Sequence, residues 1–377
     1  AAGDAGFFDS VFRISVEGTL AISGTPTSSK RWFENTVRVN VTDGKLTITN
    51  ASGASNNKIN FVSIRQISSA PTPTPEPTGA VKWPTSFSRR ADAPVDRFES
   101  YGFAWKGKVY VLGGFANDNF KGTSRVDVYD VAANKWTRLS DMPAPFSHSG
   151  FAFDAETGTA YFISGYRGPY PSYTVNDFWK YEVDANRWTK LGETPFEGGA
   201  ASAALVEGGL HYIGGVTHIR DETTNWHWTY DLNNPDAGWV RLADAPVARD
   251  HAASVVVNGQ IYIVGGEVGH DNNPTQHKTL YRYDPATATW TRLADAPISR
   301  SHNEASTFVW NGKIVSVGGQ THGQVASRSV CVYDPATNKW TTVANFPVPL
   351  QGTVAQKVGN QIVVTGGANP TPREQHP

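Results

Sequence analysis

Cysteine and methionine are almost absent, since Cys331 and Met142 are the single residues of their kinds among 377. One cysteine excludes a disulfide framework and any metal site built from several cysteines. Charged residues make up only 18%, and the formal net charge is −1. A chain that binds nucleic acid usually carries a basic excess, so we expect no nucleic-acid partner. No run approaches the ~18 apolar residues that span a bilayer, so we expect no membrane insertion.

Turn-forming and aromatic residues are abundant, with Gly 36, Pro 23, Trp 12 and Tyr 14, and they favour a β-rich fold. Between Pro71 and Thr78, proline alternates with threonine or glutamate, which predicts an extended spacer. We therefore expect a first domain at 1–70, a Thr/Pro-rich linker at 71–80 and a second domain at 81–377. Linkers of this kind are common in secreted proteins, so we expect a secreted, extracellular or cell-surface location.

After the linker, one phrase recurs with a period of about 50 residues. Its tryptophans are Trp136, Trp188, Trp239, Trp290 and Trp340. An apolar segment ending in a glycine pair, such as Ile261–Gly266, lies upstream of each tryptophan, and a tyrosine segment lies between the two. Four short strands in each period are the blade unit of a β-propeller.

The glycine pair, the spaced tyrosine and tryptophan, and the basic residue before the first strand resemble the kelch repeat over residues 82–370. The resemblance implies an all-β, six-bladed kelch propeller of the galactose-oxidase-like superfamily. We expect the glycine pairs where the blades converge and leave no space for a Cβ atom. The sixth blade has strands only from Gly352 to Gly367, and we expect Thr85–Pro94 to supply its outer strand, with Phe87 at the tryptophan position.

The first 70 residues alternate apolar and polar side chains, which predicts half-buried strands of a small β-sandwich. The strands expected are Phe12–Val16, Thr36–Val41, Lys45–Ile48 and Lys58–Ile64. Phrases such as Asp43-Gly-Lys-Leu46 resemble the second half of malectin-like carbohydrate-binding modules. The resemblance implies a partial jelly roll and a link to sugar binding.

The most informative residues are expected on one face of the propeller. In each blade, with strands a to d from the axis outward, the d–a connections and b–c loops surround the central channel. Histidines occupy one register at the start of three blades, and arginines precede two of them. The ligand-binding candidates on this face are His148, His251, His302, Arg97, Arg249, Arg300, Tyr166, Arg167, His218, Trp226, His270 and His322.

Imidazole binds zinc and copper, so His148, His251 and His302 are the metal candidates, although we expect neither metal nor cofactor. The copper-radical chemistry of galactose oxidase is excluded, because no Tyr-His pair stands at the blade starts. In addition, Cys331 belongs to a strand whose alternation predicts burial.

Three functions stay open. The first is recognition of an extracellular glycan or protein, in which aromatic faces such as Trp226 stack on sugars and the two arginines Arg249 and Arg300 pair with carboxylates. The second is a carbohydrate-active enzyme resembling a polysaccharide lyase, with His251 or His302 as base, Tyr166 as acid and the same arginines as neutralising groups. The third is a structural component of an extracellular assembly that docks or self-assembles. We favour a non-enzymatic role.

Overall fold

The computed structural model divides into two compact units, Ala1–Gly79 and Ala80–Pro377. The structure describes residues 2–3, 8–35, 37, 39–60, 62, 83, 86–116, 120–168, 172–217, 222–270 and 273–368. The expected linker 71–80 therefore lies outside the described residues. In the part that is described, no helix is long and apolar enough to cross a membrane.

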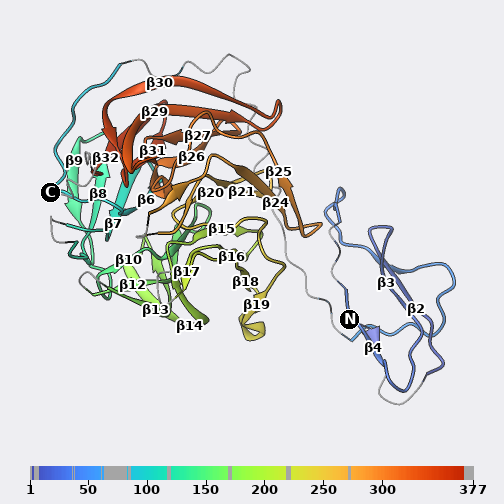
Figure 1. Ribbon diagram of the computed structural model, residues 1–377. Helices are drawn as coiled ribbons and strands as arrows, with labels where there is room; N and C mark the ends of the chain where they lie inside the picture. The colour runs from blue at the N-terminus through green and yellow to red at the C-terminus, as the bar shows by residue number, and fades with distance from the viewer. Residues whose placement is uncertain are drawn as a thin grey trace. The chain divides into compact units, whose positions relative to one another are not determined.

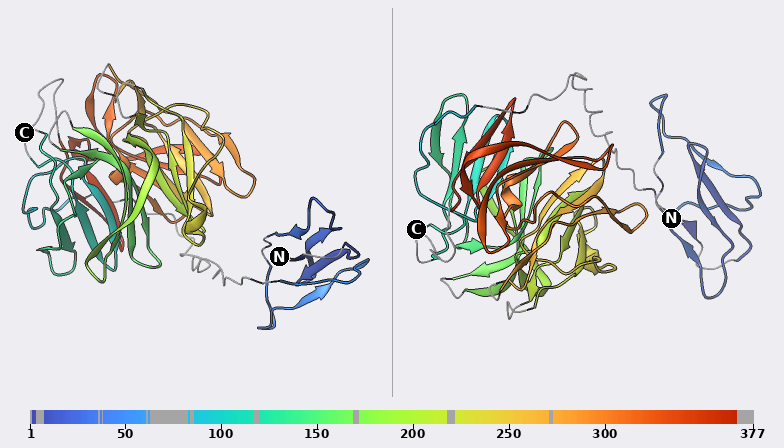
Figure 2. Two further views of the ribbon diagram at one scale, coloured as in Figure 1. Left: turned by 90° about the horizontal axis from the view of Figure 1, so that it is seen from below. Right: turned by 45° about the horizontal axis from the view of Figure 1, so that its top comes forward.

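The second unit is a propeller of six antiparallel sheets arranged around a ring, as Figures 1 and 2 show. Blade 1 consists of β6 (Tyr101–Trp105), β7 (Lys108–Leu112), β8 (Val126–Asp130) and β9 (Lys135–Arg138). Blade 2 consists of β11 (Gly150–Asp154), β12 (Thr159–Arg167), β13 (Tyr173–Glu182) and β14 (Arg187–Gly199). Blade 3 consists of β15 (Ser202–Val206), β16 (Gly209–Ile213), β18 (His227–Asp231) and β19 (Trp239–Arg241).

Blade 4 consists of β20 (Ala253–Val257), β21 (Gln260–Val264), β24 (Leu280–Asp284) and β25 (Thr289–Arg292). Blade 5 consists of β26 (Thr307–Trp310), β27 (Lys313–Val317), β29 (Val325–Asp334) and β30 (Lys339–Leu350). The sixth sheet has β31 (Val354–Val358) and β32 (Gln361–Thr365). Short strands extend the channel-side loops: β10 (Phe146–Ser147), β17 (Val216–Thr217), β22 (Glu267–Val268), β23 (Thr275–Gln276) and β28 (Gln320–Thr321).

The repeated tyrosine and tryptophan form a lock between neighbouring blades. In blade 5, the Asn338 Oδ1 atom accepts hydrogen bonds from the Tyr333 hydroxyl at 2.9 Å and from the Ala294 backbone N–H at 2.8 Å. The Trp340 indole N–H donates to the Ala294 carbonyl at 2.9 Å. Because Ala294 follows the outer strand of blade 4, this set of bonds ties the two blades together. The same lock recurs at Asn134 and Asn186.

The glycine pairs serve a second inter-blade contact. Gly265 and Gly266 have φ of 66° and 89°, and the Gly266 N–H donates to the carbonyl of Arg300 in the next blade at 2.8 Å. A Cβ atom on Gly265 would lie 2.2 Å from that carbonyl oxygen. The pair is therefore required by left-handed backbone and by close approach to the next blade, which confirms and sharpens the crowding expected from the sequence.

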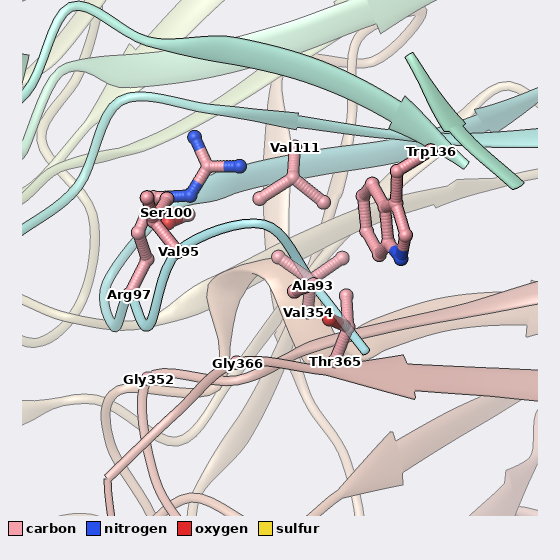
Figure 3. Close-up of a pocket in the computed structure, with 10 residues that line it drawn as sticks. All are labelled: Ala93, Val95, Arg97, Ser100, Val111, Trp136, Gly352, Val354, Thr365 and Gly366. Atoms are coloured by element: carbon pink, nitrogen blue, oxygen red, sulfur yellow. The ribbon is translucent and has the colours of Figure 1, made fainter. Parts of the chain in front are cut away.

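The ring closes through backbone contacts between the sixth sheet and blade 1. The Gly367 N–H donates to the Arg97 carbonyl at 2.7 Å, and the Glu99 N–H donates to the Gly352 carbonyl at 2.8 Å. A cavity of about 10 Å³ remains at this joint, between Trp136 of blade 1 and Val354 of the sixth sheet (Figure 3). A space of that size holds one water molecule at most, so the joint is closely packed.

The outer strand expected for the sixth blade is not formed in the described part of that segment, which corrects the sequence-based prediction. Described residues 86–94 form no strand, so the sixth sheet has two strands in the part of the chain that the structure describes. The segment instead lies against both neighbours. The Ala91 N–H donates to Asn134 of blade 1, and the Phe87 ring packs edge-on against Phe346 of β30 at 5.1 Å. Side-chain contacts to both neighbours replace the ladder of a strand.

The first unit contains a three-stranded sheet in the order β3 (Thr19–Gly24), β2 (Phe12–Val16), β5 (Ile48–Asn50), and the pair β1 (Ala2–Gly3) and β4 (Trp32–Phe33). Its small core contains the buried side chains of Phe12, Ile14 and Ile22. The described residues of the expected strands at 36–41 and 58–64 form no strand. Alternation alone was misleading there, because no partner strand covers those residues in the described part of the unit.

Candidate functional site

Six residues, one at the start of each blade, form a ring around the propeller axis that we call the collar. Its members are Glu99, His148, Ala200, His251, His302 and Gly352. All six have positive φ, between 46° and 58°. Five backbone hydrogen bonds of 2.7 to 3.2 Å join each collar residue to the next, from His148 through Ala200 around to Glu99. Left-handed backbone costs a non-glycine residue about 1–2 kcal/mol, so the ring is a conformation that the blades impose.

The collar lies at one end of a channel between the six inner strands. The channel has a volume of about 490 Å³, and its wall includes Glu99, His148, His251 and His302. Further along the channel, small residues of the inner strands alternate with the rings of Phe151 and Phe153. The three histidines that the sequence placed in one register thus share one opening.

The three histidine side chains are in direct contact. The ring centroids of His251 and His302 lie 4.0 Å apart with nearly parallel planes, and those of His148 and His251 lie 5.0 Å apart, edge to face. Glu99 joins them from blade 1. Its carboxylate lies 3.2 Å from His148 Nε2 and 3.6 Å from His302 Nε2. A fourth side chain of the same register therefore completes the group.

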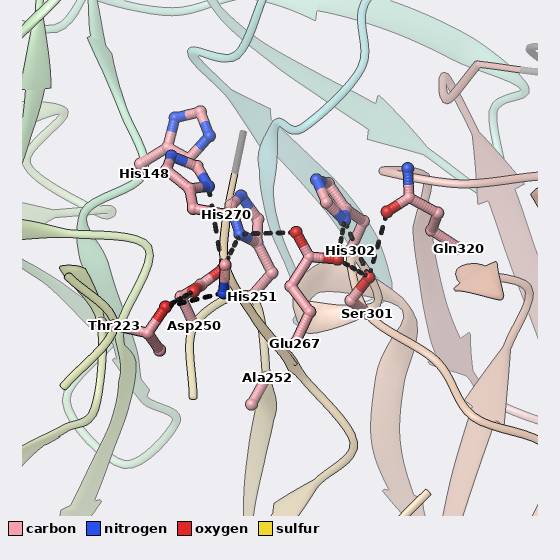
Figure 4. Close-up of polar contacts among 12 residues, drawn as sticks. His148, Thr223, Asp250, His251, Ala252, Glu267, His270, Ser301, His302 and Gln320 are labelled. Carbon is pink, nitrogen blue, oxygen red and sulfur yellow. Dashed lines mark hydrogen bonds and ion pairs between the residues drawn. The ribbon is translucent and has the colours of Figure 1, made fainter. Parts of the chain in front are cut away.

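In each of these histidines, Nδ1 contacts the side chain of the preceding residue. His251 Nδ1 lies 2.8 Å from Asp250 Oδ1, and the other two lie 3.0 to 3.1 Å from the hydroxyls of Ser147 and Ser301. Figure 4 shows this arrangement around His251 and His302. The contact fixes the orientation of each ring, so Nε2 of His148 and of His302 is directed to Glu99.

Two buried carboxylates support the collar from behind. Asp250 accepts a hydrogen bond from the Thr223 hydroxyl at 2.7 Å, and Glu267 accepts one from the Ser301 hydroxyl at 2.6 Å (Figure 4). Burial, together with the charge of Glu267, raises the pKa of Asp250 well above its ordinary value. Burial lowers the pKa of His302, but the charges of Glu267 and Glu99 outweigh it, so the pKa is raised. The collar is therefore a region of negative potential that favours a positive charge.

Tyr166 and His270 extend the network away from the axis. The Tyr166 hydroxyl lies 2.8 Å from His270 Nε2, and His270 Nδ1 lies 3.7 Å from Asp250 Oδ1. The Tyr166 ring also packs against His148, with centroids 4.5 Å apart. The structure thus brings Tyr166, His148, His251, His302 and His270 of the sequence-based set into one cluster.

The arginines of that set require a correction. Arg300 is fully buried and donates to the Ser316 and Gly318 carbonyls, and Arg249 donates to the Gly265 carbonyl at 2.7 Å. Arg97 is paired with buried Asp127 at 2.7 Å. These guanidinium groups hold their own blades together, so we remove all three from the candidate site. The lyase-type neutralising role expected of Arg249 and Arg300 is lost with them.

The remaining candidates lie elsewhere. Trp226 packs between blades 2 and 3 against Phe196, Arg167 pairs with Asp177 on blade 2, and His322 is exposed in the turn after β28. His218 lies outside the described residues. Trp226 was expected to stack on sugar, but its ring packs against the hydrophobic core of the blades instead.

Glu99 and Asp250 were not among the predicted site residues. Their signal was nevertheless present in the repeats. Arg97-Phe-Glu99 aligns with Arg249-Asp-His251 and with Arg300-Ser-His302, which places Glu99 in the histidine register. An alignment that ignores residue type would have found it.

A ring of six antiparallel sheets, joined by glycine-pair contacts between blades and carrying a polar channel mouth, defines a kelch-type β-propeller. A sequence profile described as the Attractin/LZTR1 β-propeller matches residues 174–375, and one described as the Kelch motif matches residues 104–143. The chain belongs to the Attractin/LZTR1 β-propeller family.

Curated relatives are also kelch proteins. The chain is 24% identical over 337 residues to the kelch repeat-containing protein At3g27220 of Arabidopsis thaliana, covering 84% of this chain and 77% of that protein. It is 30% identical to the kelch-like protein terF of Aspergillus terreus over 56% of this chain and 47% of that protein. It is likewise 30% identical to kelch-like protein 25 of Xenopus tropicalis, over 61% and 38% respectively. The chain thus spans less than half the length of the latter two relatives.

Among solved structures, the one titled "Structure of YjhT" superposes with a TM-score of 0.62 at 17% identity. The match covers 76% of this chain and 94% of that chain. At this identity, the likeness concerns the fold alone. It supports the propeller architecture and says nothing about the collar.

Proposed function

We propose that the protein is an extracellular recognition protein whose channel mouth binds a neutral glycan residue. Kelch propellers generally mediate interactions with protein partners, and the proposal adds a ligand class to that general role. The observation that carries it is the convergence of the collar on a channel of about 490 Å³, since ligand pockets typically measure about 300–1,000 Å³.

The lining of the channel fits a sugar. Hydroxyl groups need donors and acceptors side by side, and His148, His302, Glu99 and Gln356 supply both around the channel. The rings of Phe151 and Phe153, which also line the channel, offer apolar faces to the C–H side of a pyranose. Acidic sugars fit less well, because the predicted arginine partners face away from the channel and the collar itself carries a carboxylate.

The proposal also covers the location of the protein and the role of its first unit. The Thr-Pro sequence at 71–78 and the single cysteine support a secreted or cell-surface protein. We also propose that residues 1–70 are a partial malectin-like module, on the basis of its sequence phrases. A module of this kind would add a second contact to the same glycan-bearing surface.

Glycan-array binding of the full chain tests the proposal. We expect binding to neutral glycans in preference to uronic-acid polymers, and loss of that binding in His302→Gln and His148→Gln. Arg292→Ala, on the exposed outer strand of blade 4, is the matched control and should bind as the parent chain does. Binding confined to uronates, or binding that the two mouth variants retain, contradicts the proposal.

A carbohydrate-active enzyme is the second candidate, and one observation favours it. Tyr166, His270 and Asp250 form a connected series of titratable groups behind the collar, and proton-transfer catalysis uses groups of these types. Release of reducing ends or of unsaturated products from a polysaccharide panel, lost in His270→Gln, would establish this candidate in place of simple recognition. The third candidate, a surface-assembly component, predicts large ordered oligomers by light scattering.

A further inference from the structure

The collar brings together the donor atoms of a metal-binding site. One ligand atom each from Glu99, His148 and His251 lies within 4.8 Å of the others. The Glu99 carboxylate lies 3.2 Å from His148 Nε2 and 3.6 Å from His302 Nε2. In a tetrahedral zinc site the ligand atoms lie roughly 3.3 Å apart, given zinc–nitrogen bonds near 2.0–2.1 Å. The 3.2 Å between Glu99 and His148 is close to that value, and the donor atom of His251 lies within 4.8 Å of both.

The contacts behind these residues are those of metal-ligating histidines. A histidine that binds a metal through one nitrogen usually donates its other N–H to a carboxylate, carbonyl or water. His251 Nδ1 meets Asp250 in this way, and the Nδ1 atoms of His148 and His302 meet serine hydroxyls. Nε2 is therefore the nitrogen that each ring would present to an ion on the axis.

Burial and charge fit the same assignment. The side chains of His148, His251 and His302 are 7%, 2% and 11% exposed, and that of Glu99 is 17% exposed. Glu99 supplies a carboxylate within the ring itself, and Asp250 and Glu267 lie buried directly behind it. The cation would thus enter a preorganised site of negative potential, and the adjoining channel offers both a path to it and space for an open coordination position.

A second group of donors, Asp250, His251, Glu267 and His270, also lies within 4.8 Å. It is less suited to an ion. His251 Nδ1 and Asp250 Oδ1 already share a 2.8 Å hydrogen bond, and His270 Nε2 is 2.8 Å from the Tyr166 hydroxyl. An ion in this group would have to break the very contact that orients His251 toward the collar.

We propose that the collar binds one divalent transition-metal ion of the zinc type through Glu99, His148 and His251. Imidazole and carboxylate ligands suit zinc, and cobalt(II) takes the same positions with a visible spectrum. The proposed ion shares Glu99 and His148 with the proposed glycan site, so its test uses the metal alone.

The test is titration of the chelator-treated full chain with Co²⁺ and then Zn²⁺. We expect one Co²⁺ per chain with the visible absorption of a low-coordinate site, displacement of that absorption by Zn²⁺, and a higher melting temperature with Zn²⁺. Glu99→Gln should weaken Zn²⁺ binding more than about 100-fold, and Asp250→Asn, behind the ring, by about 10–100-fold. The matched control His322→Gln, an exposed histidine outside the collar, should bind as the parent chain does.

His270→Gln separates the two donor groups. Loss of the cobalt spectrum in His270→Gln together with its retention in Glu99→Gln would place the ion behind the collar and overturn the proposal, as would the absence of stoichiometric binding to the parent chain. Thermal melting in the presence of chelator identifies variants that do not fold. If Glu99→Gln is one of them, His148→Gln replaces it. If the titration fails but the chelator-treated chain still binds glycans, the metal proposal is overturned and the recognition proposal stands.

Discussion

Acid should weaken the propeller through one buried pair of imidazoles, His211 on β16 and His227 on β18. Their rings meet at 2.9 Å between His211 Nδ1 and His227 Nε2, and both are nearly inaccessible to water. His227 also packs edge-on against Tyr283 of blade 4 at 4.6 Å. Burial lowers the pKa of His211 to about 4 and that of His227 to about 3, the latter helped by the charges of His211 and Arg241.

The sign follows from the proton balance. In the unfolded chain both imidazoles bind protons below pH 6.5, whereas in the folded chain they stay neutral down to about pH 4. Their contribution to stability is thus complete above pH 6.5 and is lost as the pH falls toward 4. On going from pH 8 to pH 5, each group lowers the free energy of unfolding by about 2 kcal/mol, so the pair lowers it by about 4 kcal/mol.

Urea unfolding of the full chain at pH 8 and pH 5, followed by tryptophan fluorescence, measures this loss. His302 and Asp250 have raised pKa values and act in the opposite direction, so the comparison must be with a variant. His211→Gln/His227→Gln should lose about 4 kcal/mol less than the parent chain on acidification, while exposed His322→Gln should match the parent. Equal pH dependence in the parent chain and the double variant would refute the reasoning.

Three further substitutions test the blade contacts. Ala288 has φ of 52° at the position that Asn338 occupies in the next blade, so Ala288→Asn should restore the missing lock and raise stability by about 1 kcal/mol, measured by urea unfolding. Asn338→Ala should lower it by about 1 kcal/mol, because the Tyr333 hydroxyl and the Ala294 N–H lose their acceptor; an unchanged midpoint would count against the lock. Arg300→Ala should cost at least about 3 kcal/mol by the same measurement, since several buried acceptors lose their donor, whereas a ligand-binding arginine would leave stability unchanged.

The propeller could be predicted from the sequence because its contacts repeat. The spacing of glycine pair, tyrosine and tryptophan expresses the same two inter-blade contacts in successive blades, so each copy reinforces the assignment. Where the repeat is broken, prediction failed. The segment around Phe87 matched the outer-strand phrase, yet it is held by its neighbours' side chains rather than by a strand partner.

The site was only partly predictable, for a different reason. The register of a side chain follows from the repeat, and this placed His148, His251 and His302 correctly at one opening. The direction of a long side chain depends on its rotamer and on nearby carbonyls. Arg300 is next but one to a collar residue, but its guanidinium group turns into blade 5 because the Gly318 carbonyl is within reach there. Residue type alone had led to the prediction that the Arg300 guanidinium group faces the channel.

The collar explains how one scaffold can carry different chemistries. Its backbone bonds fix six positions, and only the side chains vary between blades. Ala200 and Gly352 stand in blades 3 and 6, on opposite sides of a six-membered ring, and they separate the pair Glu99 and His148 from the pair His251 and His302. Because the four large side chains face each other across the ring, the chain places its acid and its imidazoles together without any change to the blades that hold them.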